Sequence, residues 1–312
     1  MRSVLFTSVL ACLLVLPPAS AITLPVAGWS APTHAALQAL IDRTVCTDHG
    51  HSPIAAFDAD GTLWAGDAYG AFSSVLVRKG LIDGSAAARI EHEYSRSEAQ
   101  ERKRWLLESL SLFGGLRLEQ MQAAAEEAWV SCGSPGDSGG LRDTLRPEMA
   151  NLVRCLRQAG WRVLMVTASP AEAVLRGAQA LGIPEGDVFA IRLETDAALG
   201  TATGRPSAVM PLTWRDGKAR ALEAHGLAGR LALAVGNSMD DYPMIELCQA
   251  NGGAGMFCVP RPKAAEDPWT GAAEGKGRLV TLAEQQGLLL HEASAGPSDF
   301  SAQCAAGPAA ES

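Results

Sequence analysis

Apart from one helix-rich block, the chain alternates between short apolar runs and segments with a helical hydrophobic period. The apolar runs predict strands at 53–58, 161–166, 188–191, 231–235 and 256–259. Apolar residues three or four positions apart predict helices at 147–160, 169–181, 216–225 and 240–248. Strands that alternate with helices are typical of parallel crossovers. We therefore expect an α/β fold with a parallel sheet covered by helices on both faces.

A helix-rich block interrupts this alternation after the first strand and extends from about residue 67 to residue 130. Its apolar residues predict one long or broken helix over 85–113 and another over 118–129. The Gly- and Ser-rich stretch 131–140 is typical of a linker. A Gly- and Thr-rich span at 199–213 is compatible with a hairpin. The pattern thus predicts an α-helical insertion into the α/β fold.

The N-terminal stretch MRSVLFTSVLACLLVLPPASA has the pattern of a secretory signal peptide. Arg2 supplies a short basic region, residues 4–16 form an apolar core too short to span a bilayer, and residues 19–21 offer a small-residue cleavage site. We expect residues 1–21 to be removed and the mature chain to be exported to the periplasm or secreted. No other segment is long and apolar enough to cross a membrane, so we expect no membrane association after cleavage.

The charge balance argues against nucleic acid as a partner. Loss of Arg2 with the signal peptide would leave 25 basic residues against 34 acidic ones, a net charge of −9. Nucleic acids and anionic membranes require a basic surface instead. Cleavage would also reduce the seven cysteines to six. An even number permits disulfides in an exported protein but does not define their pairing, and nothing in the composition defines the oligomeric state.

Polar side chains follow the predicted strands at their carboxyl ends, where ligands bind to open α/β sheets. Asp58 and Asp60 follow the first strand, and Thr167 follows the strand that ends at Val166. Lys218 lies in the first turn of a predicted helix, where it opposes the helix dipole. We therefore expect an anionic partner to hold Lys218.

This combination is typical of phosphoryl transfer through a carboxylate nucleophile. Ionised Asp58 would attack phosphorus, and Asp60 would protonate the leaving alkoxide and later deprotonate the water that cleaves the acyl phosphate. Thr167 would donate a hydrogen bond to phosphate, and Lys218 would neutralise charge on phosphate and nucleophile. Mg²⁺, bound by Asp58 and a backbone carbonyl group of the same loop, would screen the two anions from each other.

Four segments resemble, in order, the motifs of the haloacid dehalogenase-like hydrolase superfamily: FDADGT at 57–62, the apolar run that closes on Thr167, the isolated Lys218, and GNSMDD at 236–241. The resemblance covers roughly residues 53–245. It implies a Rossmann-like core and Mg²⁺-dependent phosphatase activity on a small phosphorylated substrate. It also implies Asp58 as nucleophile and Asp60 as general acid/base.

The helical insertion resembles the cap of the phosphoserine-phosphatase-type subgroup, which would close over the substrate and exclude water. The expected organisation is then a signal peptide at 1–21, a Rossmann-like core at 22–64 and 141–290, a cap with its linker at 65–140, and a disordered tail at 291–312. Phosphocholine-like or phosphoserine-like substrates are implied by the capped relatives, and the aromatic residues favour the former. Trp64 is the best candidate to contact the substrate.

The fourth motif departs from the pattern of the family, which usually begins with Gly-Asp where this chain has Gly236-Asn237. An amide oxygen can still bind Mg²⁺, but with less charge. Either Asp240 or Asp241 could compensate. The resemblance thus implies metal ligands from the set Asp58, Asp60, Asn237 and Asp241.

Several alternatives stay open from the sequence alone. A non-catalytic binding protein or a dehalogenase could share this fold, and residues 136–140 spell GDSGG, the nucleophile signature of a secreted serine protease. The Ser169-Pro170-Ala171-Glu172 segment has the pattern of a helix capping box. Residues 238–241 have the same pattern, so Asp241 could serve structure instead of a site.

Overall fold

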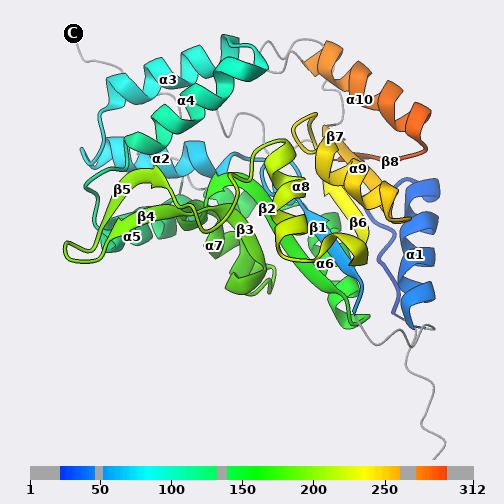
Figure 1. Ribbon diagram of the computed structural model, residues 1–312. Helices are drawn as coiled ribbons and strands as arrows, with labels where there is room; N and C mark the ends of the chain where they lie inside the picture. Colours follow the sequence, from blue (N-terminus) through cyan, green and yellow to red (C-terminus); the bar gives the residue numbers. More distant parts are fainter. Residues whose placement is uncertain (1–21, 46–51, 132–138, 261–271, 294–312) are drawn as a thin grey trace, which may run out of the picture.

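The computed structural model describes residues 22–45, 52–131, 139–260 and 272–293 (Figure 1). The proposed signal peptide lies outside these residues. The described strands are β1 (Ile54–Phe57), β2 (Arg162–Pro170), β3 (Val188–Ile191), β4 (Leu193–Asp196), β5 (Thr201–Pro206), β6 (Leu231–Gly236), β7 (Ala254–Pro260) and β8 (Leu289–Ala293). The described α-helices are α1 (Ala31–Val45), α2 (Ala68–Arg78), α3 (Gly84–Arg96), α4 (Ala99–Ser111), α5 (Leu118–Val130), α6 (Pro147–Gln158), α7 (Ala171–Ala180), α8 (Asp216–Ala224), α9 (Tyr242–Ala250) and α10 (Ala272–Gln286).

The predicted parallel sheet is confirmed. Six strands pair in parallel in the order β3-β2-β1-β6-β7-β8. The chain runs outward from β1 through β2 to β3, returns to β6 on the other side of β1, and runs outward again to β8. The strand order therefore reverses between β1 and β6. Ligands bind beyond the carboxyl ends of the strands at such a reversal.

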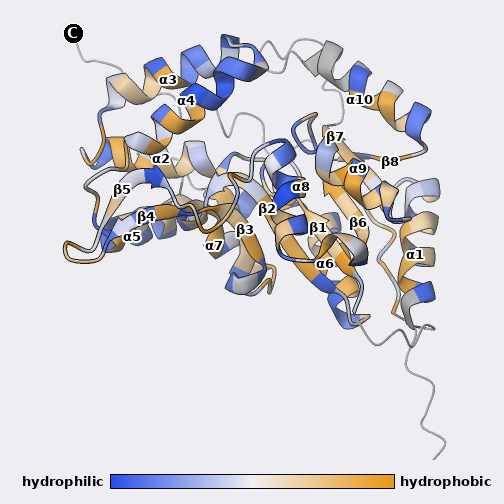
Figure 2. Cartoon of the chain, in the orientation of Figure 1, coloured by the Kyte–Doolittle hydropathy of each residue, from blue (hydrophilic) through white to orange (hydrophobic). Residues whose placement is uncertain are grey.

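Both faces of the sheet are covered, as expected. In β1, Ala55 and Phe57 pack into one hydrophobic cluster, whereas Ile54 and Ala56 pack into a second cluster on the opposite face. A strand buried on both faces has a continuous apolar sequence without polar alternation, which explains the run IAAF. Figure 2 shows hydrophobic residues along the central strands of the sheet.

Helices α2–α5 form the expected insertion between β1 and β2. The helix expected over 85–113 is broken, because Ser97 and Glu98 adopt extended backbone angles between α3 and α4. Helix α5 packs against α2 and also against the core helix α7. Figure 1 shows α2–α5 and the strands β4 and β5 gathered on one side of the molecule. The antiparallel β4–β5 hairpin begins at Leu193, earlier than the sequence indicated.

The last two elements of the core, α10 and β8, were not anticipated. Strand β8 pairs with β7, so residues 291–293, expected in a disordered tail, belong to the sheet. Helix α1 also contacts this strand, since the Thr33 hydroxyl donates to the Leu290 carbonyl oxygen at 2.7 Å. Within the residues described, no helix has the length and apolar character needed to span a membrane.

Candidate active site

The reversal point of the sheet brings the predicted polar residues together. Asp58 follows β1 and Asn237 follows the neighbouring strand β6, while Thr167 lies in β2 on the other side of β1. Lys218 reaches the same place from the first turn of α8. Asp58, Thr167 and Lys218 are at most 5% exposed. Residues that are distant in the sequence therefore form one buried polar cluster.

Lys218 has the anionic partners that its position on the helix demands. Its Nζ atom lies 2.6 Å from Asp58 Oδ1 and 2.5 Å from Asp241 Oδ1. Burial alone would lower the pKa of Lys218, but the charges of Asp241 and Asp58 outweigh burial and raise it. The side chain is therefore a permanent cation between two carboxylates.

Asp58 does not have the ordinary carboxylate pKa that the sequence argument assumed. Burial and the negative charge of Asp241 raise the pKa of Asp58 to about 7, although Lys218 opposes the shift. Thr62 donates a hydrogen bond to Asp58 Oδ2 at 3.2 Å. A further cation near Asp58 would favour its ionised form.

The side chain of Asp60 is bound by three donors, none of which is Lys218. Its Oδ1 atom accepts from the Trp64 indole nitrogen and from the Ala68 backbone nitrogen, each at 2.7 Å, and its Oδ2 atom accepts from the Ser169 hydroxyl at 2.6 Å. Burial raises the pKa of Asp60, and these hydrogen bonds oppose the shift only in part. A carboxyl group in this environment retains its proton to higher pH than a free aspartate.

Trp64, which was expected to contact substrate, is fully buried, packs edge-on against Trp129 and donates to Asp60. Another sequence expectation is wrong. Ser169 was expected to cap a helix, but β2 continues through Pro170 and α7 has no side-chain cap. Ser169 and Thr167 are two positions apart on one strand, and this period is the signal that could have placed Ser169 on the same face as Thr167.

Asn237 provides the geometric test for a bound cation. Its amide oxygen faces Asp58 Oδ2 and the Asp60 carbonyl oxygen; with the amide turned over, the nitrogen would donate to the same two atoms at 3.2 and 3.1 Å. With the oxygen inward, the Asn237 amide oxygen lies about 3 Å from each of the other two oxygens, the spacing that neighbouring ligands of octahedral Mg²⁺ have. Gly61 makes room for this, because a Cβ atom there would lie 2.0 Å from the Asn237 amide nitrogen. The donor set therefore fits Mg²⁺.

Asp58, Asn237 and the backbone carbonyl group expected from the Asp58 loop meet at this point, whereas the Asp60 carboxylate is bound elsewhere. Asp241 is used elsewhere: its Oδ2 atom accepts from the backbone nitrogens of Asn237 and Ser238, each at 2.9 Å, and its Oδ1 atom binds Lys218. Among the described residues, no three His, Cys, Asp or Glu side chains group in a way that could hold a metal. The groups that could bind a metal are one carboxylate, one amide and one carbonyl group, from the two loops that follow β1 and β6.

Asp240 belongs to the junction between core and insertion. Its Oδ2 atom accepts from the Trp214 indole nitrogen at 3.1 Å, and Arg215 lies 3.6 Å from its other oxygen. Burial, together with the charge of Asp240, raises the pKa of Tyr94 on α3. The insertion thus lies close to the loop that carries Asn237.

Thr167 lies where the sequence indicated, at the edge of the cluster. Its hydroxyl oxygen accepts from the Ser169 backbone nitrogen at 3.1 Å, and its carbonyl oxygen accepts from the buried Thr213 hydroxyl at 2.6 Å. A hydroxyl that accepts from a backbone amide still has its own proton to donate.

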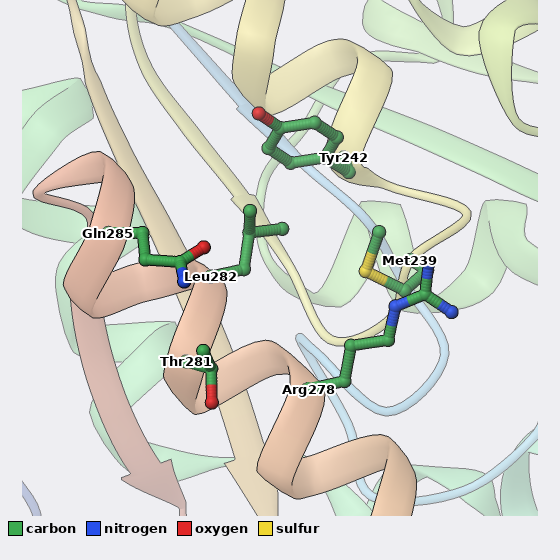
Figure 3. A pocket seen from close by; sticks show the side chains of 6 residues that line it. All are labelled: Met239, Tyr242, Arg278, Thr281, Leu282 and Gln285. Atoms are coloured by element: carbon green, nitrogen blue, oxygen red, sulfur yellow. The ribbon is translucent and has the colours of Figure 1, made fainter.

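A separate hollow of about 300 Å³ lies between α9 and α10 (Figure 3). The residues that line it are Met239, Tyr242, Arg278, Thr281, Leu282 and Gln285. None of the predicted catalytic residues lines this hollow, so it is distinct from the buried polar cluster.

The described cysteines are not paired. Cys155, Cys248 and Cys258 are buried free thiols, and burial raises the pKa of Cys248 and of Cys258 to about 12. The other cysteines, Cys12, Cys46, Cys132 and Cys304, lie outside the described residues. So does Ser138, the residue that a serine-protease reading of GDSGG would need.

Comparison with known proteins identifies the family to which the chain is similar and solved structures that have its fold. Residues 55–246 match the haloacid dehalogenase-like hydrolase family. No curated protein matches the chain by sequence. A solved protein of unknown function from Bordetella pertussis Tohama I has a TM-score of 0.58 and 21% identity over 78% of this chain and 99% of that chain.

Two further solved structures have the same fold. A functionally unknown protein from Anaerococcus prevotii DSM 20548 has a TM-score of 0.61 and 15% identity over 84% of this chain and 92% of its own. A cytosolic 5'-nucleotidase IIIB bound to cytidine has a TM-score of 0.56 and 13% identity over 86% of this chain and 90% of its own. At these identities the likeness concerns the fold alone.

Proposed function

Because this chain belongs to the haloacid dehalogenase-like hydrolase family, we propose that it is a Mg²⁺-dependent phosphomonoester hydrolase that acts through an aspartyl-phosphate on Asp58. The observation that supports this most is the difference between the surroundings of the two aspartates. Lys218 binds Asp58, whereas Asp60 lies in a separate set of donors that leaves its pKa raised. Two carboxyl groups with different environments suit different roles.

In the proposed first step, a carboxylate oxygen of Asp58 attacks phosphorus and the bond to the leaving oxygen breaks. Asp60 gives its proton to that oxygen, so an alcohol departs and an acyl phosphate remains on Asp58. In the second step Asp60 accepts a proton from water, and the resulting nucleophile attacks phosphorus. Asp58 is released as a carboxylate, phosphate departs, and Asp60 has regained its proton.

The other residues of the cluster stabilise charge. Lys218 offsets the negative charge of Asp58 and of the transferred phosphoryl group, and the Thr167 hydroxyl donates to a phosphoryl oxygen. Asp58, the Asp60 carbonyl oxygen and Asn237 would hold Mg²⁺, whose charge would reduce the repulsion between nucleophile and phosphate. Asp60 also favours a phosphatase over a dehalogenase, because release of halide needs no proton donor for an alkoxide.

The proposed substrate is small and carries a cationic group, as phosphocholine-like and phosphoserine-like compounds do. Asp67, at the start of the insertion, retains accessible surface. Nevertheless the protein packed around it raises its pKa to about 7 by desolvation, and the charges of Asp60 and Glu91 raise it further. A cation on the leaving group would relieve this repulsion. Preference for phosphocholine over glycerol phosphate, reduced in Asp67→Asn, would support this; equal rates in the native protein would contradict it.

The assay for the proposed function is hydrolysis of p-nitrophenyl phosphate by the mature chain, with Mg²⁺ or with EDTA. We expect activity that requires the metal and disappears in Asp58→Asn. The matched control is Asp42→Asn, which changes an exposed carboxylate on α1 and should leave the activity intact. Activity that persists in EDTA or in Asp58→Asn would contradict the proposal. Release of halide from a haloacid without Mg²⁺ would instead favour a dehalogenase.

We also propose that the chain is exported to the periplasm or secreted, on the pattern of residues 1–21.

A further inference from the structure

The loop at 58–66, which follows β1, is bound by the segment that leads into α6. The Ala65 backbone nitrogen donates to the Thr144 carbonyl oxygen at 2.8 Å, and the Arg146 backbone nitrogen donates to the Leu63 carbonyl oxygen at 3.0 Å. These two segments lead into and out of the cap, defined here as helices α2–α5. They form a short antiparallel pair, so the loop that carries the two aspartates is attached to the start of α6.

The side chain of Arg146 binds the same loop. Its Nη2 atom donates to the Gly61 carbonyl oxygen at 3.3 Å, and the residue is only 4% exposed. A guanidinium group is always charged, and a charge that is removed from water requires a partner of opposite charge. A neutral carbonyl oxygen cannot provide one, so a carboxylate is expected near Arg146.

Glu148, in the first turn of α6, is that carboxylate. Burial raises the pKa of Glu148, but the hydrogen bond with His291 and the nearby positive charges, among them Arg146, outweigh burial and lower it. The Nε2 atom of His291 lies 3.3 Å from Glu148 Oε1, and the ring of His291 packs on Trp29. The edge strand β8 thus supports the carboxylate that compensates the charge of Arg146.

The pair of Arg146 and Glu148 adjoins the candidate active site through Cys258 of β7. Burial raises the pKa of Cys258 to about 12, the charge of Arg146 opposes this shift, and the charges of Glu148 and Asp58 add to it. One thiol is therefore within electrostatic range of Arg146 and of the proposed nucleophile. The buried arginine lies next to the catalytic cluster and not at a remote place in the core.

Gly61 lies between Arg146 and the proposed metal ligands. Arg146 binds its carbonyl oxygen, whereas a Cβ atom on Gly61 would overlap the amide group of Asn237. The preceding peptide group carries the Asp60 carbonyl oxygen, which lies 3.1 Å from the Asn237 amide. Both peptide groups share the Cα atom of Gly61, whose φ angle of 76° turns the chain at this point. A displacement of the Gly61 carbonyl group therefore also moves the Asp60 carbonyl oxygen.

We propose that Arg146 is a positioning residue: its guanidinium group fixes the Gly61 carbonyl group and so keeps the Asp60 carbonyl oxygen where Asp58 and Asn237 would hold Mg²⁺. This rests on the proposed function. Arg146 acts through the backbone of the loop, as residues that orient metal ligands do. The alternative is a purely structural role, in which loss of Arg146 lowers the free energy of unfolding and leaves the affinity for Mg²⁺ unchanged.

Calorimetric titration with Mg²⁺ distinguishes the two roles without relying on turnover. Arg146→Met removes the guanidinium group, and we expect it to weaken Mg²⁺ binding roughly tenfold or more. The matched control is Arg162→Met, which breaks the ion pair with Asp187 at the amino end of β2 and should leave the affinity for Mg²⁺ unchanged. Native affinity in Arg146→Met, or an equal loss in both variants, would overturn the proposal.

Steady-state hydrolysis of p-nitrophenyl phosphate at saturating Mg²⁺ provides a second readout. We expect Arg146→Met to lower kcat about 10- to 100-fold, because small displacements of reacting groups cost this much. The value of KM should stay within about twofold of native, since the proposed phosphate-binding side chains of Thr167 and Lys218 come from other elements. An unchanged kcat, or a rise in KM alone, would overturn the proposal.

The double variant Arg146→Met/Glu148→Gln replaces Arg146→Met if the latter does not fold, because it removes both charges and leaves neither unpaired. We expect the same loss of Mg²⁺ affinity, and native affinity would overturn the proposal. If the native chain binds Mg²⁺ but hydrolyses no phosphomonoester, the proposed function fails, while the titration still decides the role of Arg146. A native chain that binds no Mg²⁺ would overturn the positioning role itself.

Discussion

The Nζ atom of Lys218 lies 2.6 Å from Oδ1 of Asp58, although 160 residues separate them in the sequence. The same ammonium group binds Asp241 at 2.5 Å. One buried cation therefore faces two buried carboxylates, and the cluster has an excess of negative charge when both are ionised. A phosphate would add to that excess, whereas a divalent cation next to Asp58 would offset it.

Lys218→Met tests how much the protein depends on this cation. The change leaves Asp58 and Asp241 as unpaired buried carboxylates, so we expect the free energy of unfolding near neutral pH to fall by about 3–5 kcal/mol. The matched control is Lys79→Met, which breaks an exposed pair with Glu127 and should cost less than about 1 kcal/mol. Urea unfolding followed by circular dichroism measures both. Equal losses in the two variants would show that the Lys218 pairs do not stabilise the fold.

Asn237→Asp tests the proposed metal ligands. A second carboxylate next to Asp58 Oδ2 and the Asp60 carbonyl oxygen supplies more charge to the cation, so we expect Mg²⁺ to bind roughly tenfold more tightly. Asn237→Ala removes the ligand and should weaken binding. Calorimetric titration with Mg²⁺ compares the three proteins without relying on turnover. Unchanged affinity in both variants would mean that Asn237 does not bind the metal.

The raised pKa of Asp58 predicts a pH dependence of stability in EDTA. In the unfolded chain this carboxyl group has its ordinary pKa of 3.8, whereas in the folded protein the pKa is about 7. Between these values the folded state binds more protons, so stability falls as pH rises through this window. Thermal unfolding at several pH values should show a smaller decline in Asp58→Asn, with higher stability than the native protein at the upper end. An identical decline in both proteins would show that Asp58 does not cause the pH dependence of stability.

Gly204→Ala tests the packing between hairpin and cap, and Gly200→Ala is its matched control. Both glycines have positive φ angles, of 75° and 64°, so alanine strains the backbone similarly at each. Only at Gly204 would the added Cβ meet backbone atoms of the cap, whereas Gly200 faces open space. We expect Gly204→Ala to destabilise the protein by about 1–3 kcal/mol more than Gly200→Ala, measured by urea unfolding. Equal free energies of unfolding in the two variants would mean that the hairpin and the cap can move apart to accommodate the added Cβ atom without loss of stability.

The sequence was sufficient to predict the parallel sheet and the insertion. A strand that is apolar on both faces and then ends in Asp58 and Asp60 is a pattern that few structures other than a buried parallel strand produce. The position of Asn237 followed from topology, because strand ends on the two sides of a reversal point meet at one edge. The anionic partner of Lys218 was expected for another reason, because a lysine in the first turn of a helix opposes the helix dipole. The structure brings both side chains to Asp58.

The partners of individual side chains could not be predicted in the same way. The segment that begins at Ser169 fits a helix cap by local pattern, but pairing of Pro170 with Ile191 extends the strand and turns the Ser169 hydroxyl to Asp60. Asp241 forms the local contact that its capping pattern predicts, because its Oδ2 atom accepts from the Ser238 backbone nitrogen, but its Oδ1 atom also binds Lys218. The long-range contact replaces the local pattern at Ser169 and adds to it at Asp241, and the sequence contains no record of either contact.

The C-terminal elements were missed for a different reason. Strand β8 is five residues long and carries His291 and Glu292 among its apolar residues, so it lacks the run that marks the central strands. His291 is buried all the same, because its ring packs on Trp29 and its Nε2 atom lies 3.3 Å from Glu148. A polar side chain that is buried against distant residues leaves no hydrophobic signal in its own segment.

The most direct measurement is identification of the covalent intermediate. The protein is mixed with Mg²⁺ and a phosphomonoester that it turns over, quenched in acid within one turnover, digested and examined by mass spectrometry. We predict one phosphoryl group on the peptide that contains Asp58, and none in Asp58→Asn. Turnover without a phosphorylated peptide, or a phosphoryl group on any other residue, would contradict an aspartyl-phosphate mechanism at Asp58.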